Sequence, residues 1–216
     1  MNIIFKEANF ELIIKKSKFI SYSYPIFSEE EAIQKINIIK KKHYDAKHNT
    51  FAYIMGEDGS IIKYNDDKEP QGTAGKPILD IMHNNFLTYS LIIVTRYFGG
   101  ILLGTSGLIH AYKDSAKGVI KESIILPIKK SIRIKILIQY DYINIIKRFI
   151  DEVSKRDIYL LNELYEEEVE MLFSVDINEI EYFNQQIINL TKGKIKFNQL
   201  DIINYVYYDK KVHILK

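Results

Sequence analysis

Two glycine-rich loops in the first half of the chain carry the residues that could do chemistry. They are Gly72–Gly75, followed by Lys76, and Gly99–Gly107, preceded by Arg96. Each loop leads into a segment whose pattern predicts a helix, so backbone N–H groups gather at the positive end of a helix dipole. The apolar run Leu91–Val94 lies between the loops and predicts a buried strand. The sequence therefore predicts an anion-binding or ligand-binding platform around one strand.

The first loop superficially resembles a P-loop but lacks two residues that this motif requires. Pro70 stands where the first glycine belongs, and Pro77 stands where a serine or threonine would bind Mg²⁺. ATP hydrolysis by that mechanism is not expected. Two interpretations stay open. The loop is either a nest of N–H groups that works with Lys76 to hold a phosphate or carboxylate, or a glycine turn that leads into a helix.

The second loop is not a dinucleotide-binding fingerprint, because the G-x-G-x-x-G spacing is absent. Arg96 and Tyr97 precede it and place a phosphate-binding guanidinium beside an aromatic face. One interpretation is close approach of the backbone to a ligand beside Arg96 and Thr105. The other is a tight strand-to-helix crossover that needs small residues.

His48 and an acidic turn are the candidates for acid–base or metal chemistry. His48 suits a general base or a phosphate ligand, although a lone histidine is more often a surface or hydrogen-bonded residue. Asp66, Asp67 and Glu69 suit Mg²⁺ held through waters, although an acidic turn before a proline is the commoner explanation. No metal-ligand spacing links the other histidines, so neither a metal nor a cofactor is predicted.

The candidate ligand-binding residues come from the two loops, the neighbouring cations and the acidic turn. They are Lys18, His48, Asp67, Glu69, Gly72, Thr73, Gly75, Lys76, Arg96, Tyr97, Gly99, Gly100, Gly104 and Thr105. Catalytic residues are not assigned, because the sequence does not supply a nucleophile, a base and an orienting group together.

Composition narrows the class of protein. The chain has 216 residues, a formal net charge of +2 and no cysteine. The near-neutral charge means that any basic surface must be local, and the lack of cysteine excludes disulfides and thiolate sites. The N-terminus does not read as a signal peptide, and no stretch reaches the roughly 20 apolar residues of a membrane span. We expect a cytoplasmic protein with no membrane partner.

The element pattern changes at Pro127. Before it, a capping box at Ser28 and Glu31 predicts a helix over 29–42, and Thr105 or Ser106 is the expected N-cap of a later helix. After it, the pattern is strand, helix, two strands, helix and strand, which is the ferredoxin-like order. We therefore predict two domains, 1–128 and 131–216.

Five segments of the first domain resemble the YigZ/Impact family. They are Ser17-Lys18-Phe19-Ile20, Ala46-Lys47-His48-Asn49, Asp66-Asp67-Lys68-Glu69-Pro70, Gly72-Thr73-Ala74-Gly75-Lys76-Pro77 and Arg96-Tyr97-Phe98-Gly99-Gly100. The resemblance implies an α+β protein. Its first domain would have the fold of domain 2 of ribosomal protein S5, and its ferredoxin-like second domain would resemble one of elongation factor G. Lys68, Thr50 and Ser106 depart from the family pattern of glycine, cysteine and glycine.

The resemblance also implies a connection to translation, which eukaryotic members regulate. Our first hypothesis is a translation-associated regulatory or binding protein with a local basic, glycine-rich site. The partners would be RNA phosphates or the ribosome, or else a nucleotide or another small anion. One alternative is an enzyme on a small phosphorylated or carboxylated substrate, with His48 as the base. Another is a regulator that binds only protein, and the sequence does not fix the oligomeric state.

Overall fold

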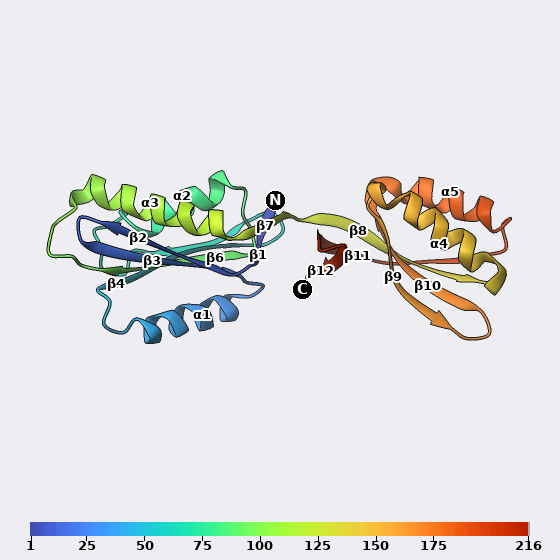
Figure 1. Ribbon diagram of the computed structural model, residues 1–216, viewed down its shortest axis with the longest axis horizontal. Coiled ribbons are helices and arrows are strands. Elements are labelled where there is room, and N and C mark those ends of the chain that lie inside the picture. Colours follow the sequence, from blue (N-terminus) through green and yellow to red (C-terminus); the bar gives the residue numbers. More distant parts are fainter. Residues whose placement is uncertain (216) are drawn as a thin grey trace. The chain divides into compact units, whose positions relative to one another are not determined.

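The computed structural model describes residues 1–215. It divides into two compact units, Met1–Pro127 and the part from Ile128 onward, which we call the first and second units (Figure 1). Each unit has its own hydrophobic core, with two clusters of buried side chains in the first and one in the second.

The first unit is a five-stranded antiparallel sheet covered by helices on both faces. Its elements are β1 (Asn2–Lys6), β2 (Ala8–Ile14), β3 (Ser17–Pro25), α1 (Glu29–Lys42), β4 (His48–Met55), β5 (Ile61–Asn65), α2 (Gly75–Asn84), β6 (Ser90–Tyr97), α3 (Gly104–Glu122) and β7 (Ile124–Pro127). The strand order is β2-β3-β6-β4-β5, and β1 pairs with β7 in a separate ribbon. Helices α2 and α3 cover one face and α1 covers the other (Figure 1).

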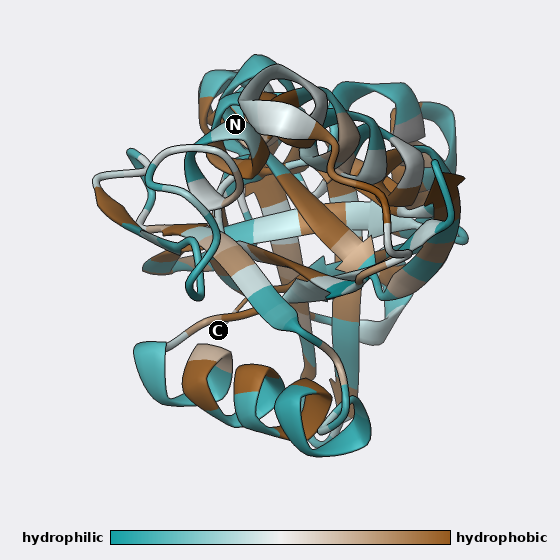
Figure 2. Ribbon diagram, turned by 90° about the vertical axis from the view of Figure 1, so that its left-hand side faces the viewer, coloured by the Kyte–Doolittle hydropathy of each residue, from teal (hydrophilic) through white to brown (hydrophobic). Residues whose placement is uncertain are grey.

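The central strand β6 is apolar throughout because both of its faces are covered. Ile92 and Val94 pack into the cluster under α2 and α3, whereas Leu91 and Ile93 pack into the cluster under α1. Successive side chains of a strand point to opposite faces, so a strand between two helical layers reads as a continuous apolar run. Figure 2 shows apolar stretches along strands of the sheets, and apolar and polar residues mixed along the helices.

Local signals fix the ends of several elements. The Ser28 hydroxyl accepts a hydrogen bond from the Glu31 N–H at 3.1 Å and caps α1, as the capping box predicts. Lys15 and Lys16 both have positive φ and close the β2–β3 hairpin as a tight turn.

The predicted cap of α3 is wrong. The helix begins at Gly104, so Thr105 and Ser106 lie inside its first turn, and Leu103 at the cap position has no side-chain hydrogen bond to it. A glycine with φ +70° at position 104 turns the chain into the helix before either hydroxyl residue is reached.

The second unit is a five-stranded antiparallel sheet with two helices packed on one face (Figure 1). Its elements are β8 (Lys129–Ile138), α4 (Ile143–Glu152), β9 (Ile158–Tyr165), β10 (Val169–Asp176), α5 (Ile180–Leu190), β11 (Lys196–Tyr208) and β12 (Lys211–Ile214), with short 3-10 turns at Tyr140–Tyr142, Ser154–Arg156 and Ile177–Glu179. The strand order is β12-β11-β8-β10-β9. Strands β1, β7 and β12 were not predicted.

We predict that residues 1–127 fold without the rest of the chain. Both core clusters of the first unit draw all their buried side chains from this segment, and a domain with its own core can fold alone. The purified fragment should show one cooperative thermal transition by circular dichroism. A fragment 1–127 that stays unfolded, while the whole chain melts as one unit, would contradict the prediction.

Candidate functional site

A cavity of about 390 Å³ opens in the first unit at the start of α3. Three segments form it: the start of β4 with Lys47, the acidic turn after β5, and the end of β6 with the loop to α3. Its lining residues are Lys47, His48, Lys68, Glu69, Pro70, Arg96, Phe98, Leu102, Leu103, Gly104, Thr105 and Leu108. The structure thus brings together His48, Glu69, Arg96, Gly104 and Thr105 of the predicted site.

A buried ion pair forms the floor of this pocket. Arg96 is 5% exposed and donates from Nη1 to Oε1 of Glu69 at 2.7 Å. The Tyr112 hydroxyl of α3 donates to the same oxygen at 2.8 Å. Burial and the adjacent Glu69 carboxylate raise the pKa of Tyr112 well above its usual range, so the hydroxyl stays protonated. Glu69 therefore neutralises the Arg96 guanidinium, which was predicted as a phosphate fork.

His48 lies beside Arg96, because the neighbouring strands β4 and β6 pair these two residues in register. Its Nδ1 is 2.7 Å from the carbonyl oxygen of Asp67, and its Nε2 is 3.7 Å from Oε1 of Glu69. A carbonyl oxygen only accepts hydrogen bonds, so Nδ1 carries a proton. Nε2 is the ring nitrogen that faces the Arg96–Glu69 pair. Asp67 also accepts the Asn49 N–H at 2.6 Å through its side chain, which ties the acidic turn to β4.

The first glycine loop does not line the pocket, and its N–H groups already bind an anion of the chain itself. The carboxylate of Asp66 accepts the N–H groups of Gly72, Ala74 and Gly75 at 2.8, 3.0 and 2.8 Å. The Thr73 hydroxyl donates to the Pro70 carbonyl at 2.6 Å. The nest geometry predicted from the glycines is present, but its ligand is Asp66.

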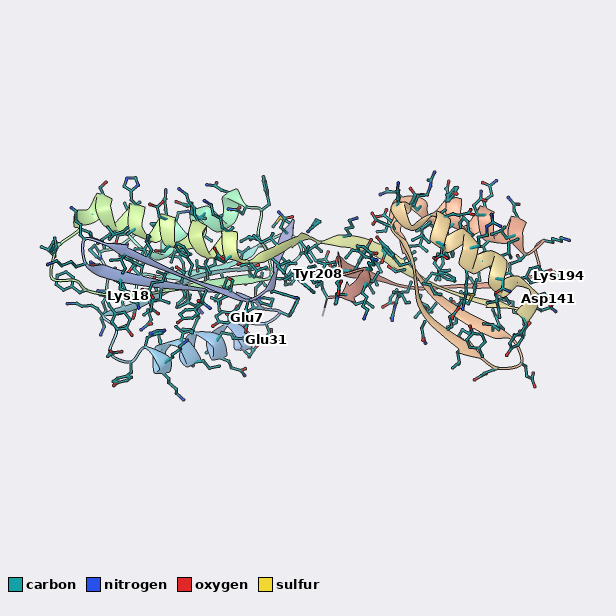
Figure 3. The ribbon with its side chains drawn as sticks, viewed as in Figure 1. Glu7, Lys18, Glu31, Asp141, Lys194 and Tyr208 are labelled. Atoms are coloured by element: carbon teal, nitrogen blue, oxygen red, sulfur yellow. The ribbon has the colours of Figure 1, made fainter. Side chains whose placement is uncertain are left out.

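Two lysines and one tyrosine of the predicted site do not line the pocket. Lys76 pairs with Asp80 at 2.8 Å on the surface of α2, and Lys18, labelled in Figure 3, pairs with Glu11 at 2.7 Å. The Tyr97 hydroxyl contacts Nδ1 of His43 at 2.9 Å. Tyr97 follows Arg96 on one strand, so its side chain projects to the opposite face of the sheet.

Two glycines of the loops are required by close packing. A Cβ on Gly99 would lie 2.0 Å from the backbone of Lys16, and one on Gly75 would lie 2.9 Å from the backbone of Asn65. Gly100 has φ +81° and faces open space, so it serves the turn itself. These positions need glycine for the fold, whatever binds nearby.

The rim of the pocket is cationic. Lys47 and Lys68 line it, and within residues 1–215 neither ammonium has a carboxylate within 4.0 Å. Because Glu69 balances Arg96, these lysines leave an excess of two positive charges. The first-turn N–H groups of α3 at Gly104 and Thr105 lie beside them, and both residues are exposed. This arrangement suits an anionic group.

The sequence reasoning missed several lining residues: Lys47, Lys68, Pro70, Phe98, Leu102, Leu103 and Leu108. Lys47 precedes His48 directly, and Lys68 lies within the acidic turn, so adjacency to predicted residues was the available signal. Lys68 has φ +69°, a conformation that favours glycine.

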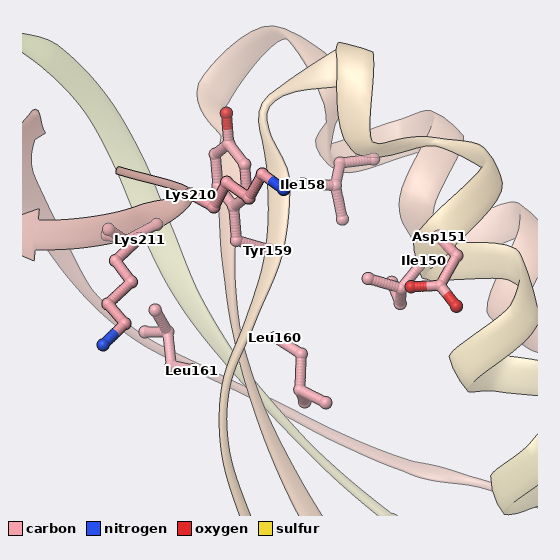
Figure 4. A pocket seen from close by; sticks show the side chains of 9 residues that line it. Ile150, Asp151, Ile158, Tyr159, Leu160, Leu161, Lys210 and Lys211 are labelled. Carbon is pink, nitrogen blue, oxygen red and sulfur yellow. The ribbon is translucent and has the colours of Figure 1, made fainter. Parts of the chain in front are cut away.

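The second unit holds a larger cavity, of about 510 Å³ (Figure 4). Tyr159, Asp151 and two lysines, Lys210 and Lys211, share it with aliphatic side chains. Among its described lining residues there is no buried carboxylate, histidine or arginine. We therefore place the candidate site in the first unit.

His43 gives the first unit a pH-dependent element. Its ring lies between the hydroxyls of Tyr22, at 2.7 Å, and Tyr97. Burial lowers the pKa of His43, and the Lys42 ammonium lowers it further.

The unfolded chain therefore takes up this proton more readily than the folded chain. We expect the free energy of unfolding to fall as the pH drops below about 6.5, the ordinary histidine value. Urea titrations should show a shallower pH dependence for His43→Gln. The same substitution at exposed His110 should leave the dependence unchanged, and equal profiles for both variants would contradict the assignment.

The described residues hold no group of three metal-ligating side chains, and no helix in this part of the chain is long and apolar enough to cross a membrane. The architecture defines a mixed α/β protein of two units whose first unit carries the candidate site.

Residues 15–120 match the family model of the Impact N-terminal domain.

Two curated relatives extend this match. The IMPACT family member YvyE of Bacillus subtilis is 36% identical over 213 residues, which cover 95% of this chain and 92% of that protein. The IMPACT family member YigZ of Escherichia coli is 36% identical over 111 residues, or 50% of this chain and 54% of that protein. The chain belongs to the IMPACT family, and the resemblance seen in the sequence is confirmed.

A solved structure supports the fold. The crystal structure of a hypothetical protein aligns over 93% of this chain and 97% of its own, with 25% sequence identity and a TM-score of 0.57.

Proposed function

We propose that this chain is a translation-associated regulatory or binding protein whose first unit holds a phosphate group in the pocket at the start of α3. The translation role is supported by membership of the IMPACT family, whose eukaryotic members the resemblance connects with translation. RNA or the ribosome are the proposed partners on that ground. The pocket supports the phosphate site.

One observation carries the phosphate assignment. Lys47 and Lys68 converge with the uncapped N-terminus of α3 on a single cavity, and the described residues offer them no carboxylate partner. Cations beside free backbone N–H groups are the usual means of holding phosphate. Because the chain is nearly neutral overall, a few placed cations must carry the interaction.

We also propose a finer classification of the units. The first would be an S5 domain 2-like fold. The second would be a ferredoxin-like domain of the elongation factor G type, which the order β8-α4-β9-β10-α5-β11 supports.

Binding at two salt concentrations tests the phosphate site. We expect Lys47→Gln/Lys68→Gln to bind nucleotides and short RNA oligomers at least about tenfold more weakly at low salt. The logarithmic salt slope should fall by roughly one unit for each lysine–phosphate interaction that the substitutions remove.

The matched control is Lys40→Gln/Lys41→Gln, which removes the same charge from the exposed end of α1. This control should bind like the unmodified chain. Salt-independent binding, or full affinity in the folded Lys47/Lys68 variant, would place the site elsewhere.

A further inference from the structure

The pocket is lined by residues of two chemical kinds. Its apolar lining, which we call the apolar wall, consists of Phe98, Leu102, Leu103, Pro70 and Leu108. Lys47, Lys68 and the first turn of α3 add positive charge to the same cavity. A cavity of about 390 Å³ falls within the roughly 300–1,000 Å³ of small-molecule sites. A ligand with one flat apolar part and one anionic part would match both kinds of lining.

Phe98 presents an aromatic surface inside this site. The side chain is 44% exposed, and its ring centroid lies 5.7 Å from both the Lys47 ammonium and the Arg96 guanidinium carbon. Partly exposed aromatic rings beside cations are stacking platforms for nucleobases. The two cations beside the ring, rather than its exposure alone, distinguish Phe98 from other exposed rings such as Phe86.

Arg96 supplies a second indication of a ligand. Its side chain is 7% exposed and lines the cavity. Its Nε–H is buried and has no acceptor among the described residues, although Nη1 is bonded to Glu69. Buried donors normally have a hydrogen-bond acceptor. An acceptor atom on a bound molecule would supply the one that the Arg96 Nε–H lacks.

Two further lysines of the predicted site add no free charge around the pocket. Lys18 pairs with Glu11 at 2.7 Å, and Lys76 pairs with Asp80 at 2.8 Å. Proteins that bind single strands use a continuous positive groove. The two pairings therefore favour a ligand that the pocket itself can hold.

We infer that the pocket takes a single free nucleotide, with its base against Phe98 and its phosphate on Lys47, Lys68 and the N-terminus of α3. This inference rests on the proposed phosphate site and names its ligand class. The apolar wall recognises the base, and the cationic rim recognises the phosphate. An RNA strand is the competing ligand.

Isothermal titration with AMP, UMP, adenosine, inorganic phosphate and a ten-residue oligouridylate tests the inference, with the oligomer length on the order of one single-strand site. We expect each monophosphate to bind about tenfold or more tightly than adenosine or phosphate alone. Phe98→Leu should lower the affinity for AMP about tenfold and leave that for inorganic phosphate unchanged. Phe86→Leu, at a ring that is 68% exposed and outside the pocket, is the matched control.

The outcomes separate the two proposals. If phosphate and AMP bind equally, and only Lys47→Gln/Lys68→Gln weakens both, the nucleotide inference fails and the phosphate site stands. If the oligouridylate binds much more tightly than UMP, the pocket serves RNA and the inference is overturned. If the lysine variant weakens nothing, both proposals fail. Phe98 is half exposed, so its variant should keep the melting temperature, and this is checked in the same samples.

Discussion

Glu69→Ala should destabilise the first unit by about 3–5 kcal/mol, the usual cost of removing one partner from a buried ion pair. The substitution leaves the Arg96 guanidinium buried without its carboxylate, and it leaves the Tyr112 hydroxyl without its acceptor. The floor would then hold a buried charge without a counter-ion. Urea unfolding of the variant and the unmodified chain measures the difference.

An exposed pair provides the control. Lys18 and Glu11 lie as close together, at 2.7 Å, but their side chains are 41% and 47% exposed, so Glu11→Ala should cost at most about 1 kcal/mol. The double variant Glu69→Leu/Arg96→Met should recover the part of the stability that the unpaired charge costs, because neither charge remains buried. The Tyr112 hydroxyl still lacks its acceptor in this variant. Equal destabilisation by Glu69→Ala and Glu11→Ala would show that the pair does not organise the floor.

The buried pair changes what Arg96 can do for a ligand. A free guanidinium offers a planar fork of donors to phosphate, whereas this one already donates from Nη1 to Glu69. The long-range attraction of an anion must therefore come from Lys47 and Lys68. Arg96 contributes geometry and one unsatisfied donor.

Sequence patterns predicted the elements well where a local rule decides the outcome. The run Leu91–Val94 is a buried strand because helices cover both faces of the sheet, and the helix from Glu29 follows its capping box. The start of α3 was misplaced because Gly104, in the left-handed region, begins the helix before the better capping residues. Residue preferences for the helix cap do not include the effect of a glycine turn that comes before the preferred residues.

The site could be predicted only in part, because its interactions depend on which groups neutralise one another. Glycines mark the N–H nest correctly, yet nothing in the spacing says that Asp66 fills it. The alternation of a strand could have separated Arg96 from Tyr97, since neighbours point to opposite faces. Phe98 lies in a loop, where no periodicity predicts a direction.

Asp66→Ala should cost the first unit about 2–4 kcal/mol, because one carboxylate accepts three backbone N–H groups and a hydrogen bond to a charged group contributes about 1.5–3 kcal/mol. The expected total is smaller than the sum of three such bonds, because the turn is only partly buried and water can take over part of the lost hydrogen bonding. Denaturant unfolding gives the size of the effect, and faster amide exchange at Gly72, Ala74 and Gly75 locates it. Asp58→Ala, in an exposed turn where the carboxylate accepts the Ser60 N–H at 3.0 Å, should cost about 1 kcal/mol or less.

An added anion provides the decisive comparison for this loop. With the Asp66 carboxylate removed, the three N–H groups regain the anion affinity of a helix N-terminus. Acetate or phosphate should then stabilise Asp66→Ala more than the unmodified chain, whose nest is filled by its own side chain. Lys76→Ala should leave binding at the pocket unchanged, because Lys76 pairs with Asp80 and does not line the cavity. Weaker pocket binding in Lys76→Ala, or equal stabilisation of both chains by acetate, would return the first glycine loop to the role of an external anion site.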